Sequence, residues 1–163
     1  MIVLYDEILS YVDYNKFKEK LNEYGIHSTA RSCHVNAKNV AIKNLKTISE
    51  EINQKILLIT MKNIISDEII TKFACYNGIV NEINGNVGIV SLNQQNLKSW
   101  SELALHETFH LHGISHCETH GCIMCFCICN GTFRYCLNCS NPCIQIHICD
   151  KCRDDINGNR NRN

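Results

Sequence analysis

The chain has 163 residues, with 16 basic and 16 acidic side chains, a formal net charge of zero and 12 cysteines. This length suits one domain, which can bury roughly 70% of its unfolded surface without disulfides. The balanced charge gives no overall field that would attract nucleic acid, and no apolar run is long enough for a bilayer span or a signal-peptide core, so we expect neither a nucleic-acid nor a membrane partner. We therefore expect a cytoplasmic protein in which cysteine thiolates bind metal instead of forming disulfides.

The first half of the chain predicts alternating strands and helices. A short apolar run predicts a strand over Ile2–Tyr5, and aromatic and leucine side chains on one face predict a helix over about 13 to 24, which Gly25 ends. A second strand is expected within residues 26 to 33. Thr47 and Glu50, three residues apart, form a capping box that predicts the start of a short helix.

The middle of the chain predicts the remaining strands. The β-rich apolar run from 55 to 61 indicates a buried strand, and residues 64 to 72 are ambiguous between helix and loop. Residues 73 to 83 and 87 to 92 predict a hairpin, with a tight primed turn at Asn84-Gly85. An edge strand here could pair with an extended peptide. Cys33 and Cys75 are interpreted as small buried hydrophobes.

A helix over about 100 to 112 is expected to carry the chemistry. Ser99 and Glu102 form a capping box, and Trp100, Leu103 and Phe109 supply buried faces. The sequence then contains a metal-binding motif, His106-Glu107-x-x-His110-x-x-Gly113-x-x-His116.

The spacing of this motif gives each residue a role. His106 and His110 stand four apart, so both imidazoles project from one helix face toward a single metal ion. Gly113 is expected to adopt positive φ and turn the chain back, which offers His116 as a third ligand. Three protein ligands leave an open position for water, which is typical of a catalytic zinc.

The alternative without a metal is that His106 and His110 are a pair of ordinary core or surface histidines on an amphipathic helix. The complete spacing makes this the weaker interpretation. His112 lies about 240° round the helix from His106, so we expect it to be partly exposed or to support the site from outside.

The motif resembles that of the metzincin clan of zinc metalloproteases, and the residues after it narrow the resemblance. Cys117 directly follows the third histidine, Cys122 and Met124 come shortly after it, and a Cys-x-x-Cys pair follows later. This arrangement is similar to that of the archaemetzincin family, and the resemblance covers roughly residues 55 to 156.

The resemblance implies two zinc ions per chain, one catalytic and one structural. It implies that His106, His110 and His116 hold the catalytic zinc, that Glu107 is the general base, and that Met124 forms the Met-turn beneath the metal. The resemblance also implies that Cys117 and Cys122 are two of the ligands of the structural zinc. The implied substrate is a peptide or protein, with a narrow, aminopeptidase-like specificity.

Two cysteine pairs compete for the rest of the structural site, because neither has the family's spacing from Met124. We favour Cys149 and Cys152 over Cys136 and Cys139, because the Arg-Asp-Asp-Ile that follows Cys152 resembles the family's C-terminal tail. Six cysteines are left over by this choice, and an additional metal, an iron–sulfur cluster or free thiols are all open for them. They are Cys125, Cys127, Cys129, Cys136, Cys139 and Cys143.

The fold class expected is α/β and metzincin-like: a mixed twisted sheet and an active-site helix, followed by a small cysteine-rich zinc-binding subdomain. We expect the boundaries 1–116 for the α/β part, 117–156 for the cysteine-rich part and 157–163 for a disordered tail. The expected function is zinc-dependent peptide hydrolysis by a metallopeptidase. The main alternative is a zinc-stabilised binding or regulatory protein with a vestigial hydrolytic site, although a site without turnover has no need of Glu107.

Overall fold

The computed structural model describes most of the chain, namely residues 1–6, 14–35, 39–65, 78–92, 100–119, 121–129, 132–135 and 147–160. The helices are α1 (Tyr14–Glu23), α2 (Ile42–Ile52), α3 (Trp100–Leu111) and α4 (Asp150–Arg160). The strands are β1 (Ile2–Asp6), β2 (Thr29–Cys33), β3 (Asn39–Ala41), β4 (Ile56–Thr60), β5 (Asn63–Ile65), β6 (Gly78–Val80), β7 (Val87–Ser91), β8 (Phe126–Cys129) and β9 (Thr132–Tyr135).

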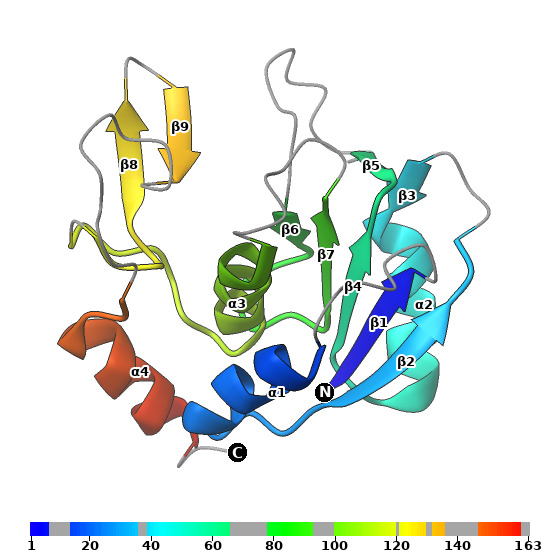
Figure 1. Cartoon of the computed structure of the whole chain (residues 1–163), viewed down its shortest axis with the longest axis horizontal. Coiled ribbons are helices and arrows are strands. Elements are labelled where there is room, and N and C mark those ends of the chain that lie inside the picture. Colours follow the sequence, from blue (N-terminus) through cyan, green and yellow to red (C-terminus); the bar gives the residue numbers. More distant parts are fainter. Residues whose placement is uncertain are drawn as a thin grey trace.

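A five-stranded sheet with the order β2-β1-β4-β7-β6 forms the centre of the molecule (Figure 1). Its first four strands are parallel, and β6 pairs antiparallel with β7 at one edge. Every residue of β4 and of β7 is buried, as expected for apolar runs inside a largely parallel sheet. The prediction of a mixed α/β sheet is confirmed.

Helices cover both faces of the sheet. The larger core joins α1, α3 and α4 to one face, and includes Phe17 of α1, Phe109 of α3 and Ile156 of α4. The smaller core joins α2 to the other face, where Leu45 packs with Leu58 of β4. Side chains alternate between the faces of a strand, so the neighbours Leu57 and Leu58 of β4 enter different cores.

Helix α1 is the predicted amphipathic helix and anchors α3. Its Phe17 and Leu21 are fully buried, and Gly25 follows in the left-handed region with φ 64°. The ring centroids of Phe17 and Trp100 are 5.4 Å apart, at the start of α3. This contact helps to fix the position of the helix that carries the histidines.

The predicted start of the second helix is wrong. α2 begins at Ile42, after an extended Ala41 that makes no side-chain capping bond, so Thr47 lies inside the helix. The burial of Leu45 against the sheet accounts for the difference, because tertiary packing of an apolar face outweighs a capping pattern in deciding where a short helix forms.

The predicted hairpin is present, but its turn is wrong. β6 ends at Val80, and residues 81–86 connect it to β7. Asn84 has φ 62°, whereas Gly85 does not have the positive φ that a two-residue primed turn requires at both positions. Instead, Oδ1 of Asn81 accepts hydrogen bonds from the backbone N–H groups of Asn86 and Val87 and closes a wider loop.

Two small sheets were not predicted: β3 pairs parallel with β5, and β8 pairs antiparallel with β9. Two of the surplus cysteines, Cys127 and Cys129, lie on β8. α4 continues to Arg160 and so includes residues 157–160 of the expected disordered tail. Further predictions lie outside the described residues, namely those for Ser99, for Cys75, for the segment 66–72, for residues 73–77 of the first hairpin strand and for residues 161–163 of the tail.

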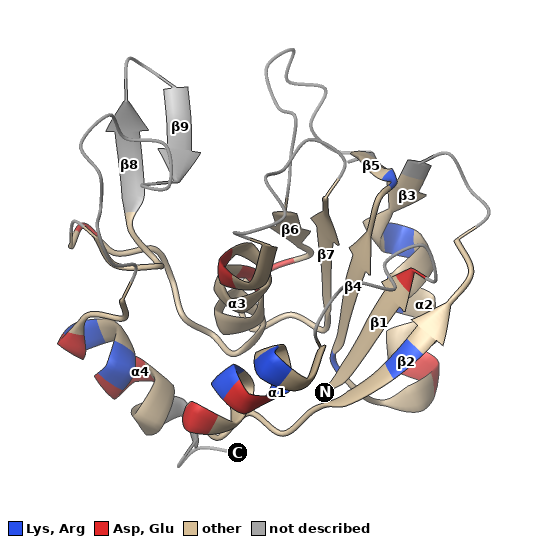
Figure 2. Cartoon of the chain, viewed as in Figure 1, with Lys and Arg blue, Asp and Glu red and all other residues tan. Residues whose placement is uncertain are grey.

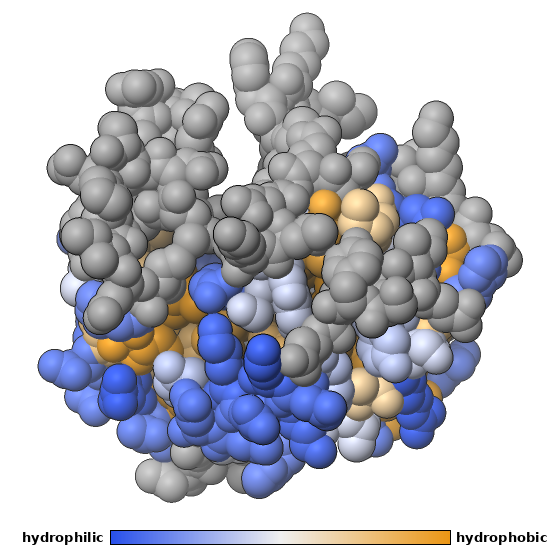
Figure 3. Space-filling model, in the orientation of Figure 1, coloured by the Kyte–Doolittle hydropathy of each residue, from blue (hydrophilic) through white to orange (hydrophobic). Residues whose placement is uncertain are grey.

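The surface carries charges of both signs. Figure 2 shows lysines and arginines interspersed with acidic residues on α1 and α4, and Figure 3 shows a hydrophilic face over α1. Among the described helices, none has the length and apolar character needed to cross a bilayer.

Candidate metal centres

Helix α3 is buried along almost its whole length. Every residue from Leu103 to Leu111 is buried, including the polar side chains of His106, Glu107 and His110. Such polar groups are costly inside a protein unless they have partners. Their burial therefore marks the helix as the site of a specific polar arrangement.

Gly113 ends α3 with the predicted reversal. Its φ is 85°, and the N–H groups of Gly113 and Ile114 donate to the carbonyls of His110 and Phe109, each at 3.0 Å. This is the glycine-based helix end in which the chain folds back on the last turn. The N–H of Asn84, in the loop after β6, donates to the carbonyl of His110 at 2.8 Å.

The reversal also fixes the histidine rings. Nδ1 of His110 lies 2.8 Å from the carbonyl oxygen of Ile114, and Nδ1 of His106 lies 2.8 Å from that of Ile123. Carbonyl oxygens only accept hydrogen bonds, so both Nδ1 atoms carry the proton and both Nε2 atoms keep a free lone pair. Backbone carbonyls orient metal-binding histidines in this way in many proteins.

The three Nε2 atoms converge on one point. They are separated by 2.9 Å between His106 and His110, 3.1 Å between His110 and His116, and 3.3 Å between His106 and His116. Two nitrogens bound tetrahedrally to zinc are about 3.4 Å apart, from a Zn–N distance of about 2.1 Å. The donor set therefore fits a zinc ion.

The histidines are held neutral. Burial, followed by the neighbouring His110, lowers the pKa of His106 to about 3, and burial lowers the pKa of His110 to about 4. The pKa of His116, which is more exposed, is also lowered by burial. Neutral imidazole is the form that binds metal, so no proton has to leave these rings near neutral pH.

Glu107 directly follows His106 on α3 and is buried like it. Only 2% of its surface is exposed, and its carboxylate faces Gly78 on the edge strand β6. His112, by contrast, is half-buried, in agreement with its expected place outside the cluster.

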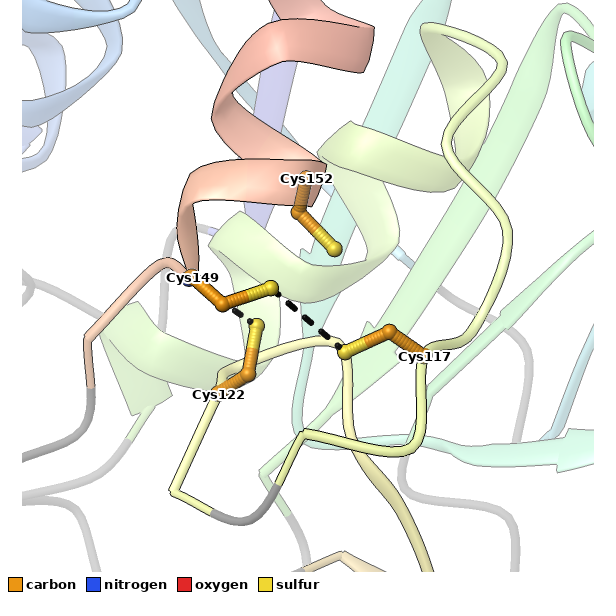
Figure 4. A group of neighbouring side chains, drawn as sticks. All are labelled: Cys117, Cys122, Cys149 and Cys152. Atoms are coloured by element: carbon orange, nitrogen blue, oxygen red, sulfur yellow. Dashed lines mark hydrogen bonds between the residues drawn. The ribbon is translucent and has the colours of Figure 1, made fainter.

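Four buried cysteines form a second cluster (Figure 4). Cys117 and Cys122 come from the loop after α3, whereas Cys149 directly precedes α4 and Cys152 lies in its first turn. The sulfur atoms of all four lie within 4.8 Å of one another. The sulfurs of Cys117 and Cys149 are 3.9 Å apart, close to the roughly 3.8 Å expected between two thiolates on one zinc with Zn–S of about 2.3 Å. This donor set also fits zinc.

The thiols of the cluster differ in acidity. Burial raises the pKa of Cys122 to about 11 and also raises that of Cys152. Burial acts in the same direction on Cys149, but hydrogen bonds from its neighbours, led by the backbone N–H of Cys152, lower its pKa to about 6. Without a cation, the thiolate form is therefore more favourable at Cys149 than at Cys122 or Cys152.

One loop joins the two clusters. The carbonyl of Ile123 accepts from His106, and the carbonyl of the fully buried Met124 accepts from the N–H of Cys117 at 2.9 Å. The N–H of Ile123 donates in turn to the carbonyl of His147, just before α4. The cysteine cluster thus holds the loop that orients His106.

Cys149 and Cys152 are the pair that joins Cys117 and Cys122, whereas Cys136, Cys139 and Cys143 lie outside the described residues. Cys125 is buried near the cluster without belonging to it. The structure does not describe the side chains of Cys127 and Cys129.

Sequence patterns did not identify the carbonyls of Ile114 and Ile123, because every residue has a carbonyl and only the fold selects these two. Gly78 also went unnoticed. Its sequence signal was a glycine inside the predicted first strand of the hairpin, residues 73 to 83, because a glycine within a strand often marks a close approach of another group.

Replacing Gly113 by alanine is expected to lower the free energy of unfolding by about 1–2 kcal/mol, because its φ of 85° is unfavourable for a residue with a Cβ. Thermal unfolding and zinc titration would measure this, and zinc affinity should fall because the Ile114 carbonyl shifts away from His110.

Gly158→Ala is the matched control, since Gly158 lies in α4 and a Cβ at this position would meet no heavy atom within 4 Å. Alanine there should be neutral or stabilising by up to about 1 kcal/mol. Equal melting temperatures for the two variants would contradict the role given to Gly113.

The sequence matches no protein-family model and no curated protein. Solved structures, however, match over nearly the whole chain. The archaemetzincin of Methanopyrus kandleri has a TM-score of 0.69 at 15% identity, covering 99% of this chain and 95% of that one. The archaemetzincin of Archaeoglobus fulgidus, complexed with malonate, has a TM-score of 0.62 at 15% identity, covering 95% and 99%.

A zinc-dependent peptidase from Methanocorpusculum labreanum matches with a TM-score of 0.64 at 17% identity, covering 96% of this chain and 100% of that one. Identities this low establish only that the folds are alike. The three matches therefore confirm the resemblance to the archaemetzincin family at the level of the fold. The chain therefore has the archaemetzincin fold.

Proposed function

We propose that this chain is a zinc metallopeptidase of the archaemetzincin family. The observation that carries the proposal is the convergence of the Nε2 atoms of His106, His110 and His116, with the buried Glu107 next to His106 on the same helix. A histidine cluster with a structural role alone would need no carboxylate next to it. The fold shared with two archaemetzincins and a zinc-dependent peptidase supports the same conclusion.

In this proposal His106, His110 and His116 hold the catalytic zinc. When bound, zinc supplies Lewis acidity, which polarises a scissile carbonyl and makes water acidic enough to lose a proton near neutral pH. Glu107 accepts that proton as general base and later delivers it to the leaving amine. The carbonyls of Ile114 and Ile123 keep two of the imidazoles in the correct tautomer throughout.

The proposed substrate is a peptide in extended conformation. Among the described strands, β6 lies at one edge of the sheet, and its Gly78 lies against Glu107. An extended peptide can add to such an edge through main-chain hydrogen bonds, which would bring its backbone close to the base. The aminopeptidase-like specificity that we propose rests on the archaemetzincin resemblance.

We further propose that Cys117, Cys122, Cys149 and Cys152 hold a structural zinc with no open position. Four thiolates around zinc form a closed tetrahedral site, whose binding energy contributes directly to folding. This zinc would fasten α4 to the loop that orients His106. Met124, fully buried in the same loop, is the proposed Met-turn residue.

The proposed binding of metal by the thiolates of Cys117, Cys122, Cys149 and Cys152 supports the further proposal of a reducing, cytoplasmic location. The alternative function, a zinc-stabilised binding or regulatory protein, is favoured only if the loaded protein hydrolyses no peptide.

A chelator is expected to remove one zinc equivalent quickly and abolish hydrolysis while the protein stays folded. The three-histidine site exchanges through its open position, whereas the thiolate site is closed. Zinc analysis, near-UV circular dichroism and turnover of a mixed peptide library would be followed together, and zinc would then be added back.

The library should contain each peptide with a free and with an acetylated amino terminus, because an aminopeptidase requires the free amine. Loss of the near-UV signal in step with the first zinc released would contradict the separate roles of the two sites. A fully loaded protein that cleaves no member of the library would favour the binding-protein alternative.

A further inference from the structure

Gly78 lies on the edge strand β6 at the point where the strand meets Glu107. A Cβ at position 78 would overlap Oε1 of Glu107 and would lie 2.8 Å from both its Cγ and its Cδ. Real Cβ atoms essentially never approach another heavy atom closer than 3.0 Å. The carboxylate therefore occupies the space that any other residue at position 78 would fill.

The side chain of Glu107 is the part that must give way to such a residue. The backbone of Glu107 cannot shift easily, because it belongs to α3 and both of its neighbours in the chain, His106 and Thr108, are buried. β6 is held by its pairing with β7, in which Gly78 is opposite Val90. The carboxylate is the flexible end of the contact, but it is almost fully buried and has little room to move.

We infer that Gly78 is a positioning residue for Glu107, because the absence of a side chain at position 78 leaves the space that the Glu107 carboxylate occupies. This inference rests on the proposed function, in which Glu107 is the general base. A base that is displaced by about 1 Å can lose roughly 100-fold in rate, so a single methyl group at position 78 should reduce catalysis without removing any ligand.

Gly88 of the neighbouring strand β7 offers a matched control. A Cβ there would lie 3.1 Å from Cδ1 of Leu57 and 3.4 Å from the ends of the Leu111 and Val80 side chains. These neighbours are apolar, and Glu107 is not among them. Gly88→Ala thus adds the same methyl group to the same sheet without overlapping the carboxylate.

The first test measures melting temperatures and needs no activity. Gly78→Ala is expected to lower Tm by about 5 °C in the parent, as overpacking of a core does. In a Glu107→Ala background its effect should disappear, because that change removes the three atoms nearest the new methyl group. Gly88→Ala should shift Tm equally in both backgrounds. An equal loss from Gly78→Ala in both backgrounds would overturn the inference.

The second test measures turnover of a cleaved peptide by zinc-loaded protein. Gly78→Ala should lower kcat by roughly 100-fold with KM changed by no more than about twofold, and it should cause no further loss in the Glu107→Ala background. Gly88→Ala should keep kcat within about twofold of the parent, and zinc content should stay the same in both. Parental kcat in Gly78→Ala would overturn the inference.

The two tests also separate this inference from the proposed function. A parent protein without peptidase activity would refute the proposed function, and the melting experiment alone would then decide whether Gly78 fixes the position of Glu107.

Discussion

Replacing Glu107 by alanine is expected to lower peptide hydrolysis by a factor of about 100 or more while both zinc sites stay filled. The proposed role of Glu107 is to move a proton, and the metal is assigned to the Nε2 atoms of three histidines. The change removes a buried carboxylate and leaves the rings and their carbonyl partners in place. Steady-state kinetics and zinc analysis on the same preparation would check this.

His110→Ala is the contrasting variant, because it removes a nitrogen from the centre of the cluster and should release the catalytic zinc. Glu107→Gln keeps the size of the side chain but cannot accept the proton, so it should be as inactive as the alanine variant. Parental rates in either glutamate variant would show that the protease assignment is wrong.

Truncation after Ile148 is expected to unfold the C-terminal half of the protein and to remove one equivalent of zinc. It deletes Cys149 and Cys152 together with Ile156, all of which are buried in the larger core. Binding of structural zinc contributes on the order of 10 kcal/mol to the folding of small zinc-binding peptides, so the loss should exceed that of an ordinary core substitution. Zinc counting and thermal unfolding would measure both effects.

Point variants separate the loss of zinc from the loss of the helix. Cys152→Ser should release the structural zinc, whereas Cys125→Ser changes an equally buried cysteine outside the cluster and should keep it. Replacing both Cys136 and Cys139 by serine should likewise lower the zinc content and the melting temperature less than the truncation does. If the double serine variant lost more zinc and more thermal stability than the truncation, the second zinc would instead be assigned to Cys136 and Cys139.

Local patterns were sufficient for much of the secondary structure. The strand at Ile2, the helix around Phe17 and the buried run of β4 were predictable, because the spacing of apolar residues reflects which face of an element is buried. The start of α2 and the turn before β7 were not predictable in this way. Packing of Leu45 decided the first, and the Asn81 side chain decided the second.

By itself, the sequence determined which residues can form the histidine centre. His106, His110, Gly113 and His116 lie within about three helical turns of chain, so helix geometry and one glycine with positive φ bring them together. Only the tertiary structure decided that Cys149 and Cys152 join Cys117 and Cys122, and that Gly78 faces Glu107. Those groups are far apart in the chain, and contacts of this kind depend on how the sheet, α3 and α4 pack together, which local spacing does not specify.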